Sequence, residues 1–197
     1  MSIAIVIVVL MLVVAGAAVI VYNGLVRKRN RTGEAWSQID VELKRRHDLV
    51  PNLVRTVQGY ATHERATLET VTAARAAAVT AGATADPAAV GTAENALNRS
   101  LRSLFAVAEN YPQLRAEEGF LALQEQLAAT EDKLEYARRY YNTSARDYDT
   151  AIQSFPGVLL AGPFGFGPRA FFETEPADRQ TPVVDFTTGS GSGTAVG

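Results

Sequence analysis

Hydrophobic and polar positions divide the chain into an apolar start and a longer part in which the two kinds of residue alternate. Residues 1–26 have no charged side chain, and residues 3–22 are almost entirely apolar. A helix of about 20 residues is about 30 Å long, the thickness of the hydrocarbon layer of a bilayer. A cleaved signal peptide, with Ala15-Gly16-Ala17 as its cleavage site, fits less well because no Lys or Arg precedes the run. A buried core helix would be shorter and would have a polar face. The sequence therefore predicts a transmembrane anchor over residues 1–26.

A basic cluster follows the apolar run directly. It consists of Arg27, Lys28, Arg29 and Arg31, and we refer to it as the basic collar. Lys and Arg next to a transmembrane helix stay on the cytoplasmic side. We therefore expect a single-pass protein of the cell membrane, with a short N-terminus outside and a cytoplasmic C-terminal domain. Membrane lipid is an expected partner, because such cations lie favourably against anionic headgroups.

From residue 36 onward, apolar residues recur every three or four positions, in a heptad-like stripe typical of a coiled coil or bundle helix. Pro51 interrupts this stripe, and a proline inside a helix removes one hydrogen bond. Asp48 could cap a new helix that has Pro51 in its first turn. The pattern therefore allows either one kinked helix over residues 23–80 or two helices that meet near residues 46–50. The stripe consists of Trp36, Ile39, Leu43, His47, Val50, Val54, Val57, Ala61, Glu64, Leu68, Val71, Arg75 and Ala78.

Two further helices are expected after a turn at residues 81–87. Asp86 is suited to cap the first, with Pro87 at its first position, and that helix should stop near residues 110–112. The last helix has the most regular apolar stripe, from Phe120 to Phe155. Strand-like alternation is absent, so the fold class is all-α, with an N-terminal transmembrane helix followed by a bundle of three or four long helices.

Charged residues on the stripes form a candidate buried polar core of Glu64, Arg75, Glu131 and Arg138. Glu64–Arg138 or Arg75–Glu131 pairs across the core would satisfy the rule that a buried charge needs a partner. The alternative is that these long side chains extend past the helix contact into water.

Residues 155–173 form a Phe-rich segment in which Gly and Pro prevent a long helix. It is either a cap over one end of the bundle or an apolar surface that contacts lipid or a partner. With four antiparallel helices the segment would lie near the bilayer, and with three it would lie far from it. The candidate interaction residues in it are Phe155, Phe164, Phe166, Phe171 and Phe172.

Composition limits the function further. The domain is expected to span residues 27–173, and residues 174–197 have the turn and linker composition of a disordered tail. The net charge of −2 does not suggest nucleic acid, and the absence of cysteine excludes thiol chemistry. His63-Glu64 begins like a zinc-protease helix, but Thr67 replaces the second histidine. We therefore predict no catalytic residue, metal, cofactor or small-molecule substrate.

Several spaced motifs within about residues 20–172 resemble the LemA family. They are AWSQIDVELKRRHDLVPNLV at residues 35–54, YATHE at 60–64, YPQLR at 111–115, FLALQ at 120–124 and ARRYYN at 137–142. Gly119 and Asp149 depart from the pattern, since the family usually has Asn at both positions.

The resemblance implies a bacterial single-pass membrane protein in which the transmembrane helix is followed by a cytoplasmic, antiparallel up-and-down four-helix bundle with long helices. It therefore favours a helix break near Pro51. It implies no established catalytic activity, and one branch of the family is linked to magnetosome membrane formation. We therefore expect a non-enzymatic scaffold or membrane-organising protein that contacts a protein partner or a second copy. The alternatives are a lipid-sensing module that uses the basic collar and the Phe-rich segment, and an accessory subunit of a membrane enzyme that uses Glu64, Glu131 and Arg138.

Overall fold

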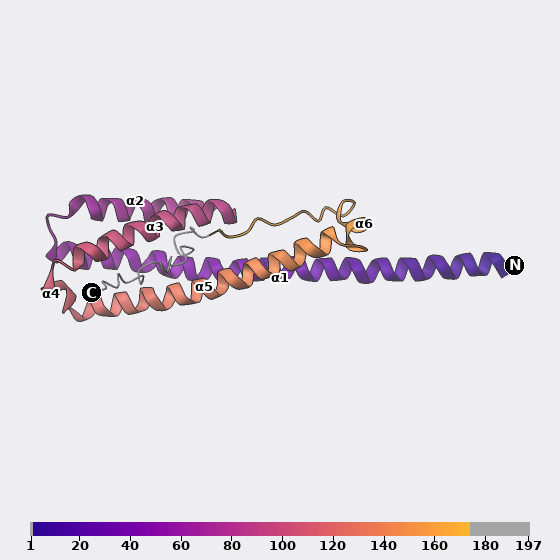
Figure 1. Cartoon of the computed structure of the whole chain (residues 1–197), viewed down its shortest axis with the longest axis horizontal. Coiled ribbons are helices and arrows are strands. Elements are labelled where there is room, and N and C mark those ends of the chain that lie inside the picture. Colours follow the sequence, from indigo (N-terminus) through magenta and orange to yellow (C-terminus); the bar gives the residue numbers. More distant parts are fainter. Residues whose placement is uncertain (1, 174–197) are drawn as a thin grey trace, which may run out of the picture.

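The computed structural model describes residues 2–173, and these residues form helices and loops without any strand. Four long helices run antiparallel to one another (Figure 1), so the predicted fold class is confirmed. The tail predicted for residues 174–197 lies outside the described residues. The long helices are α1 (Ser2–Tyr60), α2 (Arg65–Gly82), α3 (Pro87–Ala108) and α5 (Glu118–Gln153), and the short ones are α4 (Pro112–Arg115) and α6 (Gly157–Ala161).

Neither alternative for residues 23–80 is correct, because α1 does not break near residues 46–50 and does not continue to residue 80 as one kinked helix. Helix α1 continues for 59 residues and ends at Tyr60, so the break lies at residues 61–64 instead. Pro51 has no N–H to donate to the carbonyl of His47, the residue four positions earlier. The side chain of Arg75 on α2 replaces this donor, because its Nε lies 2.6 Å from the His47 carbonyl oxygen.

The later helix starts follow the local sequence. Asp86 accepts a hydrogen bond from the Ala88 N–H at 3.2 Å, and Pro87 occupies the first helical position of α3, as expected. Glu117 caps α5 in the same way by accepting from the Phe120 N–H at 2.5 Å. Each cap satisfies a backbone donor that has no partner within its helix.

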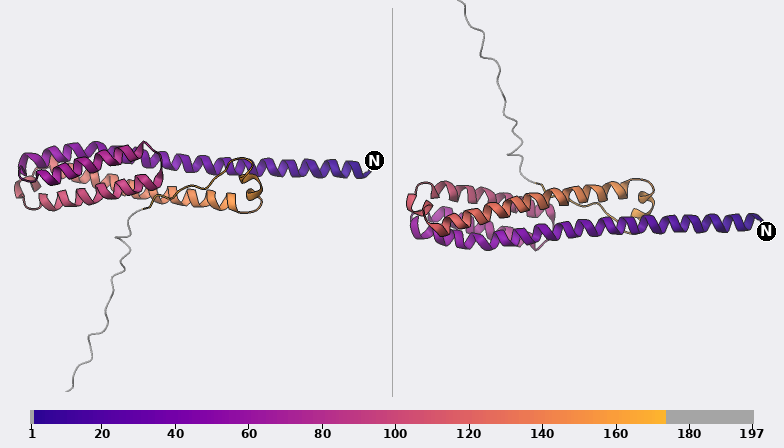
Figure 2. Two further views of the ribbon diagram at one scale, coloured as in Figure 1. Left: turned by 90° about the horizontal axis from the view of Figure 1, so that it is seen from above. Right: turned by 90° about the horizontal axis from the view of Figure 1, so that it is seen from below.

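Helices α1 and α5 extend further toward the N-terminal end of the molecule than α2 and α3 do (Figure 2). The half of the bundle far from the N-terminus, here the distal half, therefore has four helices. Its core includes Val50, Leu53, Val57, Leu97 and Leu104. The proximal half consists of α1, α5, α6 and the extended residues 167–173, which we call the strap.

Beyond the bundle, the N-terminal part of α1 projects alone (Figure 1). It is long and apolar enough to cross a membrane, and the most apolar stretch of 18 residues in it is not buried inside the molecule. No linker separates this part from the bundle, since α1 is continuous from Ser2 to Tyr60.

Candidate functional site

The Phe-rich segment folds back against the end of the anchor. The ring of Tyr22 lies edge-on to Phe164, with 5.0 Å between the ring centroids, and to Phe166 at 5.6 Å. Phe166 belongs to a small buried cluster, the proximal core, which it forms together with Leu25, Tyr148, Ile152 and Ala161. This core joins the anchor, α5 and α6 into one packed unit.

Two glycines shape this part of the chain. Gly157 begins α6 so close to α5 that a Cβ atom there would collide with the carbonyl oxygen of Ala151. Gly165 has a φ of 68°, a left-handed conformation that side-chain-bearing residues rarely adopt. Together they allow residues 155–166, here the proximal turn, to reverse direction beside the anchor.

The proximal turn has both a buried and an exposed side. Phe166 and Ala161 are buried, whereas Phe155 is 80% exposed and Leu159 is 62% exposed. Val158 and Phe164 are also exposed. The segment therefore caps the proximal core and also presents apolar side chains outward, and the contact of these side chains with lipid or a partner stays a prediction.

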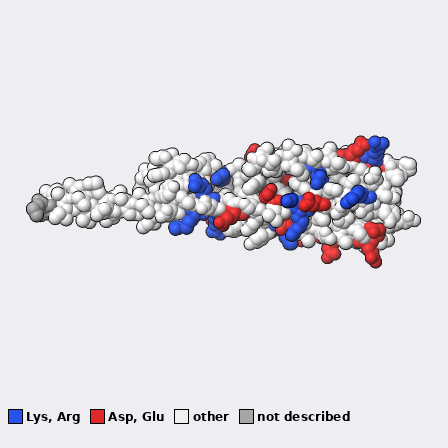
Figure 3. All heavy atoms as spheres, turned by 180° about the vertical axis from the view of Figure 1, so that it is seen from behind, with Lys and Arg blue, Asp and Glu red and all other residues white. Residues whose placement is uncertain are grey.

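The basic collar lies just beyond Tyr22. One of its members contacts the proximal turn, and another contacts α5. The Arg29 guanidinium lies over the Phe166 ring at 5.1 Å from the centroid. Arg31 donates from Nε to the Tyr140 hydroxyl at 3.0 Å, and this hydrogen bond raises the pKa of Arg31. Arg27 and Lys28 are exposed. In Figure 3 the Lys and Arg atoms nearest the projecting helix mark where charged side chains begin.

Phe171 and Phe172 lie apart from the other candidate phenylalanines, on the strap. Phe172 is buried between Trp36, with 6.0 Å between ring centroids, and Arg138, whose guanidinium lies 4.8 Å from the Phe172 centroid. Asn142 holds the Phe172 backbone by accepting from its N–H at 2.9 Å and donating to its carbonyl oxygen at 3.0 Å. These contacts attach the strap to the side of the bundle rather than to its membrane-proximal end.

A second candidate site is a buried polar cluster in the middle of the bundle. Glu94 on α3 is fully buried, and its Oε1 lies 2.6 Å from His47 Nε2. Its other oxygen, Oε2, accepts from Arg46 at 3.3 Å. Arg46 also donates to Asn98 and lies 3.2 Å from Glu131 Oε2. The polar cluster thus consists of Arg46, His47, Glu94, Asn98, Glu131 and Arg138.

The sequence analysis missed four of these residues, although one signal for Glu94 was present. Val90 and Leu97 lie seven residues apart on the apolar face of α3, and Glu94 occupies the intermediate position of that face. A charge at a core position implies a buried partner. Its partners Arg46 and His47 lie on α1, almost 50 residues earlier in the chain. His47 is on the apolar stripe of that helix, but no local pattern pairs either residue with Glu94.

Arg138 is buried, and burial lowers its pKa, whereas nearby Glu131 acts in the opposite direction. Its Nη1 lies 3.7 Å from Glu131 Oε1, seven residues earlier on the same helix. Its Nε and Nη2 make no hydrogen bond to residues 2–173. Arg138 is therefore held by Glu131 and by the face of the Phe172 ring.

Glu64 lies outside the polar cluster, which corrects the predicted Glu64–Arg138 pair. The helix break at residues 61–64 places Glu64 at the N-cap of α2, at the distal end of the bundle. Arg138 lies 20 residues into α5, about 30 Å from that end. The Arg75–Glu131 pair is also not formed, since Arg75 bonds the His47 carbonyl and Glu131 contacts Arg46 and Arg138.

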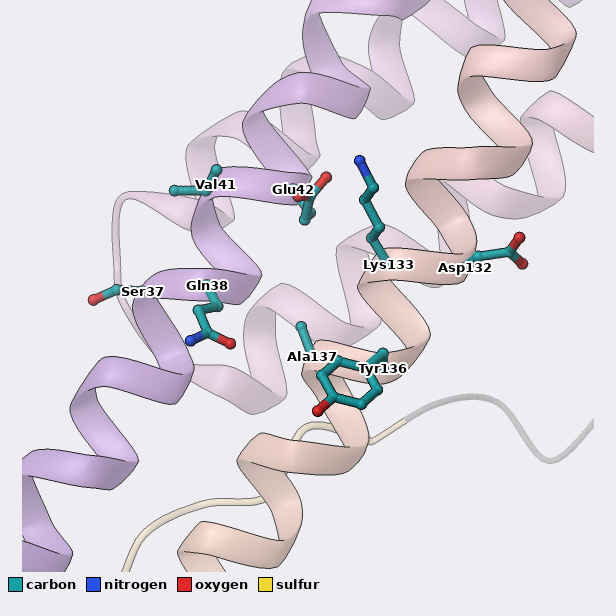
Figure 4. Close-up of a pocket in the computed structure, with 8 residues that line it drawn as sticks. All are labelled: Ser37, Gln38, Val41, Glu42, Asp132, Lys133, Tyr136 and Ala137. Atoms are coloured by element: carbon teal, nitrogen blue, oxygen red, sulfur yellow. The ribbon is translucent and has the colours of Figure 1, made fainter.

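Several grooves open on the bundle surface, and one of them, of about 810 Å³, lies between α1 and α2. Two others lie along α5. One, of about 320 Å³, lies between α3 and α5, with Arg46 and Glu131 among its lining residues. The other, of about 620 Å³, lies between α1 and α5 and has a mainly apolar lining (Figure 4). Within residues 2–173 no three His, Asp or Glu side chains are grouped so that they could hold a metal ion.

Comparison with known proteins agrees with this geometry. Residues 35–186 match the model of the LemA family. The chain belongs to the LemA family. It is also similar to the magnetosome protein MamQ of Magnetospirillum gryphiswaldense, with 25% identity over 187 residues that cover 83% of this chain and 68% of MamQ. The LemA match extends beyond the last described residue, Glu173, into the part that was predicted to be a tail.

The structure accounts for one departure from the LemA pattern and describes the surroundings of the other. Asp149 accepts a hydrogen bond from the Arg169 N–H at 3.0 Å, which the side-chain oxygen of an Asn could also accept. Gly119 lies in the first turn of α5, where a Cβ atom would come within 3.0 Å of the Glu117 carboxylate. Asp149 thus keeps a contact that an Asn could also make, whereas the structure gives no reason for glycine at position 119.

Proposed function

We propose that this LemA-family protein is a non-enzymatic, membrane-anchored scaffold that organises a membrane through protein–protein contacts of its bundle. The observation that carries this proposal is the continuity of α1 from the apolar run into the bundle. The portion from Arg27 to Tyr60 is about 50 Å long, so the bundle forms a rod that extends a fixed distance from the bilayer. A rod of fixed height brings its contact surface to the same level in every copy.

The groove between α1 and α5 is the contact surface that best fits this role. Val41 and Tyr136 on its two sides are exposed, Tyr136 by 66% (Figure 4). Charges of both signs, Glu42, Asp132 and Lys133, lie around them. A mainly apolar centre with a charged border is typical of protein interfaces.

A second copy of the chain is the occupant that the geometry favours. Two copies anchored in one membrane present the same groove at the same height, which is the condition for a two-fold symmetric contact. The mixed charges of the border allow Lys133 of one copy to approach Glu42 or Asp132 of the other. Restriction to one membrane also raises the effective concentration of the copies.

We further propose that the N-terminus lies outside and the bundle in the cytoplasm, because the four cations of the basic collar would remain on the cytoplasmic side. The similarity to a magnetosome protein supports a role in organising a membrane.

Disulfide crosslinking tests the scaffold proposal, since the chain has no cysteine of its own. Full-length Val41→Cys and Tyr136→Cys proteins would be oxidised in native membranes and analysed for dimers. Val79→Cys is the matched control, because Val79 is exposed on α2, outside the groove. We expect dimers at residues 41 and 136 above the level of the control. Equal crosslinking at all three positions, together with a strict monomer that copurifies with no partner, would refute the proposal.

A further inference from the structure

Two charge-free segments from distant parts of the sequence meet at the proximal end, where the last residues of the first segment contact the second. One is residues 1–26, and the other is residues 150–168. The Tyr22 contacts with Phe164 and Phe166 join them. Charged residues border both segments at their bundle side: Arg27 on α1, and Asp149 and Arg169 on the returning chain. On α1, on α5 and on the strap, the uncharged residues therefore end and the charged residues begin at the same end of the bundle.

Within the second segment, the outward side chains are large and apolar. Phe155, Val158, Leu159 and Phe164 are all exposed, while Ala161 and Phe166 face the proximal core. Neighbouring exposed side chains of this kind mark an interaction surface rather than an ordinary water-facing surface. The proximal turn contains no Asp, Glu, Lys or Arg, so no charged side chain of this segment would lose its hydration in an apolar environment.

The height of this patch follows from its contacts with α1. Tyr22 ends the apolar run whose length matches the hydrocarbon layer, so it lies where the helix leaves that layer. Phe164 packs on Tyr22 at the same height. Arg27 is five residues further along, about 7.5 Å, at the level of the headgroups. The proximal turn therefore lies at the boundary of acyl chains and headgroups, where apolar faces of peripheral helices are buried by about 5–10 Å.

We propose that the proximal turn is a second membrane-attachment site, which inserts Phe155, Leu159 and Phe164 into the interfacial layer of the leaflet from which the anchor emerges. The exposed apolar side chains of the proximal turn contact lipid, because the packing of Phe164 on Tyr22 places the turn at the height of the bilayer, where lipid is the surrounding medium. The adjacent basic collar favours anionic headgroups at the same leaflet surface. This inference does not depend on the scaffold role, since it concerns a different surface.

A consequence of the second attachment is a fixed orientation of the bundle. A single helix can tilt and rotate in the bilayer, and its orientation is set by whatever packs against it and by interfacial anchors. The proximal turn lies on one side of α1 only (Figure 1). Insertion of that side sets which face of the bundle turns toward the membrane and which face remains available to partners.

Depth-dependent fluorescence quenching tests the proposal on the full chain. The absence of native cysteine allows a polarity-sensitive dye to be placed at Phe155→Cys or Leu159→Cys in proteoliposomes with anionic lipid. Val9→Cys within the apolar run is the lipid reference, and Val79→Cys, on α2 and outside the groove between α1 and α5, is the aqueous reference. All four side chains are exposed in the protein, so the labels should leave the fold intact.

For the two turn positions we expect blue-shifted emission and quenching by brominated lipid of at least about half that at Val9→Cys, since the site is interfacial. We expect iodide quenching to be much weaker than at Val79→Cys. Iodide quenching equal to that at Val79→Cys, with no lipid quenching, would overturn the proposal. Protection from both quenchers would also overturn it and would indicate a protein on the patch. Crosslinking through the groove would be unaffected by either outcome, so the two proposals fail separately.

Discussion

Replacing Arg75 by methionine should destabilise the bundle more in the natural chain than in a chain that also carries Pro51→Ala. Arg75 is the donor for the His47 carbonyl, which Pro51 cannot serve. In the Pro51→Ala chain the backbone N–H of residue 51 is restored and can make the ordinary helical bond to that carbonyl. The Arg75 side chain and the restored N–H of residue 51 are therefore alternative donors to the same carbonyl oxygen.

The magnitude follows from the geometry of this contact. The Arg75 Nε lies 2.6 Å from the His47 oxygen in a part-buried position, and His47 itself is buried. A hydrogen bond from a charged donor contributes about 1.5–3 kcal/mol, and a buried acceptor without a partner costs about 1–3 kcal/mol. We expect Arg75→Met to lower the free energy of unfolding by about 2 kcal/mol in the natural chain. In the Pro51→Ala chain the loss should be below about 1 kcal/mol, a coupling of about 1 kcal/mol.

These free energies can be measured by urea unfolding of the full-length protein in detergent. Unfolding is monitored by far-UV circular dichroism and by the fluorescence of the single tryptophan, Trp36. Pro51→Ala alone should raise the free energy of unfolding, because a proline inside a helix is unfavourable. Arg65→Met is the matched control, since Arg65 on the same helix makes only an exposed pair with Glu69 at 2.8 Å. It should change the free energy by less than about 0.5 kcal/mol in either chain.

An equal loss on Arg75→Met with and without Pro51→Ala would refute this reasoning. Such additivity would mean that Arg75 stabilises the bundle by packing or by its charge, and not by replacing the missing helical donor.

Three further predictions concern the polar cluster and the strap. Glu94→Gln should lower the free energy of unfolding by about 3 kcal/mol, because it removes the fully buried negative charge that pairs with buried Arg46. Glu131→Gln, at a side chain 43% exposed, should cost at most about 1 kcal/mol, and similar losses for the two variants in urea unfolding would contradict this. Burial raises the pKa of Tyr141, so the unfolded chain ionises first as the pH rises above about 10 and stability falls there; this fall should be smaller for Tyr141→Phe, and identical pH profiles would count against the assignment. Asn142→Ala removes two hydrogen bonds to the strap and should shift Trp36 emission and speed tryptic cleavage at Arg169 without loss of helix content; unchanged cleavage would show that the strap is held by other contacts.

Much of the fold could be predicted from the sequence because its signals are local. The anchor follows from uninterrupted apolar residues, and the start of α3 follows from Asp86 and Pro87. The antiparallel bundle follows from long apolar stripes separated by short turns. Each of these signals depends on residues within one or two helical turns of one another.

Both alternatives for residues 23–80, a break near Pro51 and one kinked helix, were wrong because a local signal was outweighed by a distant one. Pro51 should end or kink a helix, yet α1 continues because Arg75 supplies the missing donor from 28 residues further along the sequence, measured to His47. The turn at residues 61–64 has no proline, and the apolar stripe continues through Ala61 and Glu64 without a gap. The period alone therefore gave no sign of a break there.

The candidate sites were predictable only in part for the same reason. Glu131 and Arg138 lie in the polar cluster as the stripe indicates, but their neighbours Arg46 and Glu94 come from other helices. The Phe-rich segment was identified by composition, whereas its division into an exposed proximal turn and the buried Phe172 of the strap depends on packing.

The sequence by itself determined that this protein has one apolar anchor, a basic collar and long amphipathic helices, since hydropathy and helix caps act between near neighbours. Only the tertiary structure decided where α1 ends, which charges meet in the core and that the proximal turn lies beside Tyr22. The physical reason is that a missing hydrogen bond, a buried charge or an apolar ring is satisfied by whichever group the fold brings within contact distance, and that group can lie anywhere along the chain.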